Sequence, residues 1–275
     1  MASALNDTSL MYAYSMTWVI GMCTPFGYGA AISDIQVTLP SGQRLNCLRK
    51  VYALGPGFIG GFAGSVELGF KFLGNMAACL RSGAPGSYIL PRAFAHKWHR
   101  FARHAFMKEP AKLRLLGCDL LMVGVSPAER FGGDGPWPRT DVIAMRSRTG
   151  FTPEYGSGFR SLSIGCGNAV EVYRRALEDP HVFVALEAGG NHGLAGGLAM
   201  RVQAVISRHP QPGVSRFTHL AVVRPASVSI ESLNWTDCEA DGTVSHHQMP
   251  LVARSWPDFC AVAARNGAVG AEAIA

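Results

Sequence analysis

The stretch "AYSMTWVIGMCTPFGYGAAISD", residues 13–34, decides the fold because it holds two short apolar runs separated by turn residues. The runs at 17–23 and 29–33 predict two strands, and the "TPFGYG" that joins them is typical of a hairpin turn. A second pair of strands is expected at 49–54 and 57–62, around the turn "LGPG". The chain is therefore expected to begin with antiparallel strands.

After "GGFAGS" the apolar residues change to helical spacing, which predicts a helix over 68–80. A second helix is expected at 91–107, with Pro91 in the first turn, where proline is tolerated. The later elements expected are strands at 118–125, 141–147 and 161–165, helices at 168–177 and 194–207, and strands at 216–223 and 227–233. This order is not the strict alternation of a parallel sheet. It predicts an α+β sandwich of two antiparallel sheets with helices on both outer faces.

The chain shows no internal repeat and no linker, so one domain is expected over 17–233. Residues 1–16 stand before it. The tail 234–275 is expected to be irregular, apart from one helix at 256–265 and an Ala/Gly-rich end that should fray.

The composition, with 48% apolar and 16% charged residues among 275, indicates a compact globular protein rather than a disordered one. The formal charge of +6 is modest, and its one concentration, at 96–114, has neither a nucleic-acid-binding motif nor interleaved aromatic residues. A solvated helix face is the simpler interpretation. It also accounts for His96, His99 and His104, of which only the first two share a helix face and so make a poor zinc site.

Seven cysteines, at positions 23, 47, 79, 118, 166, 238 and 260, form no CxxC pair and are odd in number. This pattern is typical of reduced thiols in the cytosol. Residues 1–16 lack the basic start and long apolar core of a secretory signal, and no run reaches the roughly 18 apolar residues of a membrane span. A soluble, cytoplasmic protein is expected.

Three polar residues lie at notable places in this pattern. Thr17 starts the first strand, Asp34 ends the second, and Lys50 follows sixteen positions later. Taken alone, Thr17 is an ordinary strand residue and the other two are a plain ion pair. Their surroundings decide between that interpretation and a catalytic one.

Those surroundings resemble the proteasome β-subunit family of N-terminal-nucleophile hydrolases. The resemblance runs through "SDIQVT", "RKVYAL" and "FIGGFAGSVELGFKF", and resumes at "SIGCGNAVEVYRRAL". The Met-Thr-aromatic start at residue 16 is similar to the HslV and Anbu types and to the betaproteobacterial proteasome homologue. The resemblance implies the four-layer αββα fold of that family, from Thr17 to about residue 233.

The resemblance also implies roles for the polar residues. Thr17 would be the nucleophile, with its own freed α-amino group as the base. Lys50 would stabilise the alkoxide, and Asp34 would hold Lys50 charged and oriented. Gly61, or a neighbour in "GGFAGS", would donate a backbone N–H to the oxyanion. The chemistry needs no metal and no organic cofactor.

Two positions depart from the family pattern. Cys166 stands where the family has a serine, and a thiol is a weaker hydrogen-bond partner for the α-amino group. Ser215 fits a later serine of the family, but Pro212 stands where an aspartate is expected. Cys166 as a nucleophile is the less favoured alternative, since a buried cysteine is more often a small apolar residue.

The mechanism requires Thr17 to be the first residue, and two routes would achieve this. Residues 1–16 could be a propeptide removed by self-cleavage after Met16. Alternatively, translation could start at Met16, which an aminopeptidase would remove because the next side chain is small.

The function expected from the resemblance is that of a threonine endopeptidase subunit in a ring or double ring. Its partners would be identical subunits, a peptide or unfolded-protein substrate, and an ATPase unfoldase. Two alternatives stay open: a ring subunit that has lost catalysis, which the departures at Cys166 and Pro212 favour, and a small-molecule amidase with the same chemistry.

Overall fold

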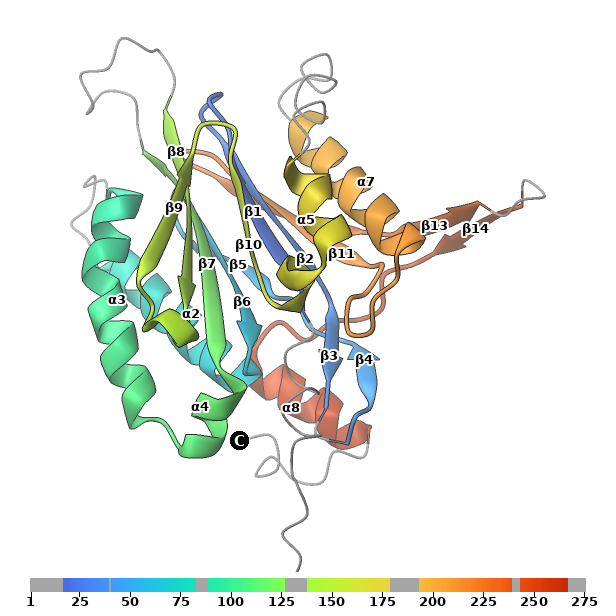
Figure 1. Cartoon of the computed structure of the whole chain (residues 1–275), viewed down its shortest axis with the longest axis horizontal. Coiled ribbons are helices and arrows are strands. Elements are labelled where there is room, and N and C mark those ends of the chain that lie inside the picture. The colour runs from blue at the N-terminus through green and yellow to red at the C-terminus, as the bar shows by residue number, and fades with distance from the viewer. Residues whose placement is uncertain are drawn as a thin grey trace, which may run out of the picture.

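The computed structural model describes residues 17–39, 41–82, 89–126, 138–178, 193–238 and 243–266. The predictions for residues 1–16 and for the Ala/Gly-rich end lie outside these ranges. Two five-stranded antiparallel sheets occupy the centre of the molecule, with helices on both sides (Figure 1). The predicted α+β class with antiparallel sheets is confirmed.

The first sheet has the strand order β10-β1-β2-β11-β12, and the second has the order β5-β6-β7-β8-β9. The first sheet contains β1 (Val19–Cys23), β2 (Gly29–Asp34), β10 (Ser161–Ile164), β11 (Thr218–Val223) and β12 (Val228–Leu233). The second contains β5 (Val51–Gly55), β6 (Phe58–Gly64), β7 (Cys118–Ser126), β8 (Arg139–Arg146) and β9 (Pro153–Ser157). The second sheet therefore follows the order of the sequence, whereas the first combines strands that lie far apart in it.

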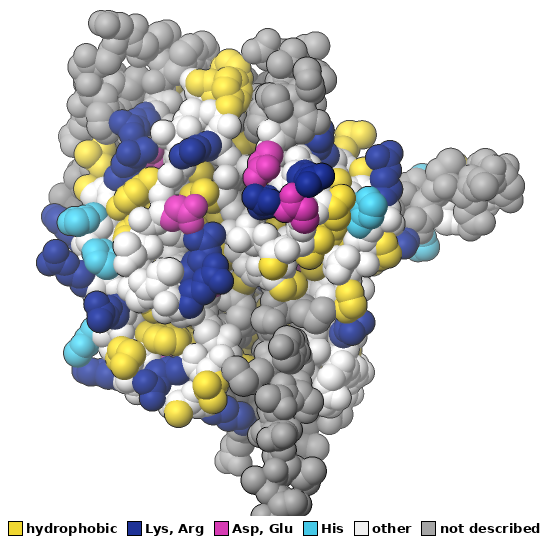
Figure 2. All heavy atoms as spheres, viewed as in Figure 1, with side chains coloured by type: hydrophobic (Ala, Val, Ile, Leu, Met, Phe, Trp, Pro, Cys, Tyr) yellow, Lys and Arg dark blue, Asp and Glu magenta, His cyan; other side chains and the backbone are white. Residues whose placement is uncertain are grey.

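The helices divide between the outer faces of the two sheets. The second sheet is covered by α2 (Val66–Arg81) and α3 (Pro91–Lys108), and α8 (Trp256–Arg265) contributes to the same core. The first sheet is covered by α5 (Glu171–Glu178) and α7 (Gly193–Arg208). Short helical segments are α4 (Ala111–Leu116), η2 (Ser147–Thr149) and η3 (Cys166–Ala169). Lys and Arg side chains predominate over α3 and α4 in Figure 2.

The alternation of side chains along the strands explains why both faces of each sheet are buried. In β7, Leu120 and Met122 pack toward α2 and α3, whereas Leu121 and Val123 pack between the sheets. Successive side chains of a strand point to opposite faces, so a strand covered on both sides is apolar throughout. The run "CDLLMVGV" has this pattern, and a third core between the two sheets results.

Gly21 in β1 allows the two sheets to approach closely. A Cβ atom at this position would lie 2.7 Å from Leu121 Cδ2 and 2.7 Å from Val142 Cγ2 in the opposite sheet. Neither distance is possible for a real methyl group without movement of the neighbours. The absence of a side chain at Gly21 is thus a packing requirement.

Several predicted boundaries differ from the structure. The strand expected at 49–54 begins at Val51, so Lys50 lies just before it. The helix expected at 168–177 is divided into η3 and α5. The elements that the sequence did not predict are β3 (Gln36–Thr38), β4 (Arg44–Asn46), α4 and β9. All are short, and most are rich in polar residues, so hydrophobic periodicity gives little signal for them.

The prediction of an irregular tail is wrong in part. Strands β13 (Trp235–Cys238) and β14 (Val244–His247) form a hairpin that extends away from the sheets (Figure 1). Backbone pairing between the two strands defines this hairpin. The predicted helix at 256–265 is confirmed as α8.

No helix among the described residues is long and apolar enough to cross a membrane.

We expect Gly21→Ala and Gly74→Ala, the same chemical change, to have opposite effects on stability. At Gly21 the new methyl group overpacks the sheet interface and should lower the free energy of unfolding by about 1–3 kcal/mol. At Gly74, inside α2, nothing lies within 4 Å of the new Cβ, and stability should rise by about 0.5–1 kcal/mol. Urea denaturation of the two variants tests this, and equal effects would contradict it.

Candidate active site

The pairing of β1 with β2 brings Thr17 beside Asp34. Val19 pairs with Ser33, so the residues just before β1 run alongside the end of β2. The Trp18 N–H donates to Asp34 Oδ1 at 2.9 Å, and the Asp34 N–H donates to the Trp18 carbonyl at 3.2 Å. These bonds fix the backbone that carries Thr17.

The Trp18 side chain anchors this segment from the other face of the sheet. Its ring stacks on Tyr173 of α5, with 4.5 Å between ring centroids, and packs in the core under α5 and α7. Because side chains alternate along an extended chain, the Thr17 side chain points to the opposite face, toward the second sheet.

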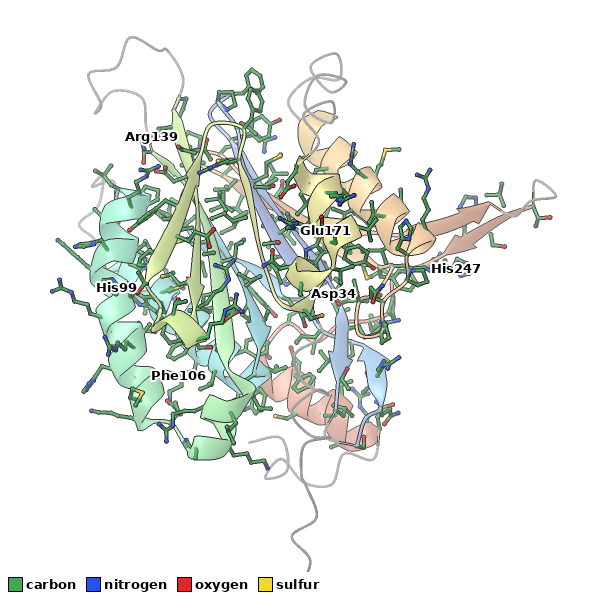
Figure 3. All side chains as sticks on the ribbon, viewed as in Figure 1. Asp34, His99, Phe106, Arg139, Glu171 and His247 are labelled. Atoms are coloured by element: carbon green, nitrogen blue, oxygen red, sulfur yellow. The ribbon has the colours of Figure 1, made fainter. Side chains whose placement is uncertain are left out.

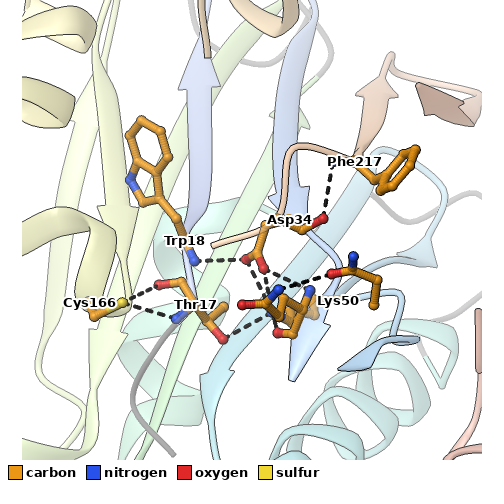
Figure 4. Close-up of polar contacts among 9 residues, drawn as sticks. Thr17, Trp18, Asp34, Lys50, Cys166 and Phe217 are labelled. Atoms are coloured by element: carbon orange, nitrogen blue, oxygen red, sulfur yellow. Dashed lines mark hydrogen bonds and ion pairs between the residues drawn. The ribbon is translucent and has the colours of Figure 1, made fainter. Parts of the chain in front are cut away.

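Lys50 reaches Thr17 from the second sheet. Its Nζ donates to Thr17 Oγ1 at 3.0 Å and lies 3.1 and 3.0 Å from the two carboxylate oxygens of Asp34 (Figure 4). It also donates to the backbone carbonyl of Gln36. The ammonium group therefore lies between the hydroxyl and the carboxylate, at the junction of the two sheets.

Burial controls the electrostatics of this group. Lys50 and Asp34 are each 2% exposed. Loss of solvation lowers the pKa of Lys50 from its usual range, and the Asp34 carboxylate opposes that shift. Asp34, at the end of β2 (Figure 3), also accepts the Gln36 N–H at 2.9 Å through Oδ2. A charge held 3.0 Å from a hydroxyl in such surroundings lowers the cost of forming the alkoxide.

Cys166 contacts the backbone nitrogen of Thr17. The Thr17 N–H donates to Cys166 Sγ at 3.2 Å, and Sγ lies 3.6 Å from the Thr17 carbonyl oxygen. Burial raises the pKa of the Cys166 thiol, which favours the neutral form. Gly165 makes this approach possible: its φ is +86°, and a Cβ there would lie 2.0 Å from the Thr17 oxygen.

Gly61 lies inside β6, paired with Val51 on one side and Leu121 on the other. Its backbone thus belongs to the sheet. The Phe62 N–H donates to the Lys50 carbonyl at 3.3 Å, on the β5 edge of the strand. Strand N–H groups alternate in direction, so the Gly64 N–H points to the same edge, beyond the start of β5. Gly64 is the neighbour in "GGFAGS" that is suited to bind an oxyanion.

Ser215 precedes β11, the strand that pairs with β2. It is 3% exposed, in the turn before β11, and its hydroxyl accepts the Phe217 N–H at 3.1 Å. Within the described part of the chain, no polar contact joins Ser215 to Thr17. The structure therefore joins Thr17, Asp34, Lys50 and Cys166 by hydrogen bonds, and the described contacts of Ser215 lie outside that network.

Two depressions lie at the site, and both are lined by Ala63 and Gly64; Thr17 lines one of them, and Gly165 and Cys166 line the other. The one on the Lys50 side is small, with polar and apolar surface in similar amounts, and its other lining residues are Val37, Thr38, Leu48, Phe62 and Val66. The one on the Cys166 side is larger and contains charged groups. No cluster of residues able to hold a metal ion occurs among the described residues.

Three features of the site were not predicted from the sequence. They are the hydrogen bond from Lys50 to the Gln36 carbonyl, the hydrogen bond from the Trp18 N–H to Asp34, and the position of Gly64 in the wall of the Lys50 depression. The position of Gln36 beside Asp34 had a signal, because an aspartate that accepts the N–H two residues on is a common turn motif, and "DIQ" has that spacing. The other two depend on strand register, which the sequence does not specify locally.

We expect Lys50→Met and Asp34→Asn each to lower the free energy of unfolding by about 3–5 kcal/mol, because each leaves one buried charge without its partner. The double variant removes both charges and should lose less than the sum of the two. A double-mutant cycle by chemical denaturation measures this coupling. Additive losses would mean that the pair is not formed.

His219 of β11 is a buried group whose ionisation opposes folding. It is 2% exposed, and burial, assisted by the charges of Arg49, Arg254 and Lys50, lowers its pKa to about 4. The unfolded chain takes up this proton near pH 6.5, whereas the folded chain does so only near pH 4. Between those values the unfolded state binds more protons, so stability falls as the pH falls.

We expect this group to remove on the order of 3 kcal/mol of stability between pH 6.5 and pH 4. His219→Asn should have a shallower dependence of unfolding free energy on pH over that window. His104→Gln, at an exposed histidine, is the matched control and should keep the dependence of the wild type. Identical pH profiles for wild type and His219→Asn would contradict the assignment.

Comparison with known proteins gives no family for this chain. No protein-family model matches it, and no curated protein matches its sequence significantly.

Proposed function

We propose that the chain is a threonine endopeptidase of the N-terminal-nucleophile class, with the four-layer αββα arrangement of proteasome β subunits. Identical subunits would form a ring whose sites face an inner cavity, and an ATPase unfoldase is the partner that this class implies. The substrate is a peptide or an unfolded protein.

One observation carries the proposal. Lys50 Nζ lies 3.0 Å from Thr17 Oγ1 and within 3.1 Å of both Asp34 oxygens, and each of the three residues is 6% exposed or less. A plain structural ion pair does not require a third partner that is a hydroxyl at the start of a strand. The arrangement suits a hydroxyl that must become a nucleophile.

The reaction proceeds once Thr17 carries a free α-amino group. That amine takes the Oγ1 proton as Oγ1 attacks the substrate carbonyl carbon, and the Gly64 N–H stabilises the oxyanion. The C–N bond breaks when the leaving nitrogen takes the proton from the amine. Water then attacks the acyl ester, with the amine again as base, and releases the acid and the free hydroxyl.

A second candidate is a ring subunit that has lost catalysis. The described contacts of Ser215 stay within its own turn, Pro212 stands in place of an acidic residue, and the partner of the Thr17 nitrogen is a thiol. Each of these weakens proton handling at the amine. Both candidates share the fold, so activity separates them.

A protein beginning at Thr17 should hydrolyse fluorogenic peptides, and Thr17→Ala should reduce kcat/KM by at least about 1,000-fold, since it removes the nucleophile. Thr17→Ser should retain measurable activity. Thr152→Ala, at an exposed threonine, is the control and should be unchanged. The intact mass establishes the first residue, and native mass establishes the assembly.

Two outcomes would contradict the proposal. Full activity of a protein that still carries residues before Thr17 would exclude the amine as base. Equal activity of wild type and Thr17→Ala would exclude Thr17 as the nucleophile.

A further inference from the structure

The position of the Thr17 nitrogen defines which side of the site receives the leaving part of the substrate. The leaving nitrogen takes its proton from the Thr17 amine, and that nitrogen lies 3.2 Å from Cys166 Sγ. Lys50 Nζ contacts the hydroxyl from the other side. The leaving peptide therefore extends over the Cys166 depression, and the acyl side chain points into the Lys50 depression.

The two depressions differ greatly in size. The Lys50 side has a volume of about 20 Å³, whereas the Cys166 side has about 560 Å³. The larger value is within the range of about 300–1,000 Å³ that is usual for ligand pockets. The structure thus offers room for long side chains after the scissile bond and little room before it.

The charged groups of the Cys166 depression are Arg114, Arg148 and Asp119. Asp119 is already engaged, since its Oδ1 accepts the Ser147 N–H at 3.2 Å. Arg114 Nε is buried and has no hydrogen-bond partner among the described residues. Arg148 is exposed at the rim, in η2. The lining thus contributes two guanidinium groups and one carboxylate, so the depression has an excess of positive charge.

The remaining wall is apolar and comes from α3 and α4. Phe106, which Figure 3 labels on α3, lines it together with Leu115 and Leu116. Leu115 is 70% exposed in the single chain. A substrate side chain with a methylene stem and an anionic end matches this combination of apolar wall and guanidinium rim.

We propose that this depression selects peptides with a glutamate or aspartate on the leaving side of the scissile bond, and that Arg114 and Arg148 bind its carboxylate. This inference rests on the proposed peptidase function. Arginine suits the task because its planar group donates two parallel hydrogen bonds to a carboxylate. The charges of Asp34 and Lys50 offset each other, so they do not compete for this anion.

The experiment compares three internally quenched peptides that differ only at the second residue after the scissile bond, which is Glu, Gln or Lys. With the protein that begins at Thr17, the Glu peptide should have a kcat/KM at least tenfold above the Gln peptide, with Lys the poorest. The difference should appear mainly in KM and should shrink at high salt, because it is electrostatic.

Arg148→Gln and Arg114→Gln should each reduce the ratio of Glu to Gln cleavage to below threefold, and Arg148→Lys should keep part of it. Arg100→Gln, an exposed arginine of α3 outside the depression, should leave the ratio unchanged. Thermal melting confirms that each variant is folded. Equal cleavage of the three peptides would overturn the carboxylate preference and leave the peptidase function standing. Failure to cleave any of them would overturn the peptidase function and, with it, the preference.

Discussion

The buried ion pair of Lys50 and Asp34 is the constraint on which the site depends. Each partner is 2% exposed, so neither charge can be left alone without a large loss of stability. The pair also fixes position, because Asp34 belongs to the first sheet and Lys50 precedes the first strand of the second. Thr17 lies beside this ion pair, and its hydroxyl is the third partner of the ammonium group.

Packing at three other residues positions the backbone at this junction of the two sheets. Gly21 lets the sheets approach, Trp18 fixes the start of β1 by stacking on Tyr173, and Gly165 lets the β10–η3 turn lie against the Thr17 backbone. Each acts at the backbone near Thr17 rather than on its side chain. The position of the hydroxyl therefore follows from the fold, and the small residues that allow it have no part in the chemistry.

The sequence predicted the long elements well, because α2, α3 and most strands of the two sheets carry strong apolar patterns. It also indicated Thr17, Asp34 and Lys50 as a group, through motifs rather than periodicity. It could not rank Gly61 against Gly64, since that choice depends on the direction of strand N–H groups. The β13–β14 hairpin was also missed, although its strands are close in the sequence, and the charged depression was missed because it brings together residues of distant segments.

The junction has a mechanical side as well. Thr17 and Lys50 come from different sheets and meet at 3.0 Å, so sliding of one sheet over the other by a fraction of that length would separate them. A molecule that binds the hydroxyl and the ammonium group at once would hold the two sheets together at this point. Tight binding in this small pocket would then restrict the motion of one sheet relative to the other.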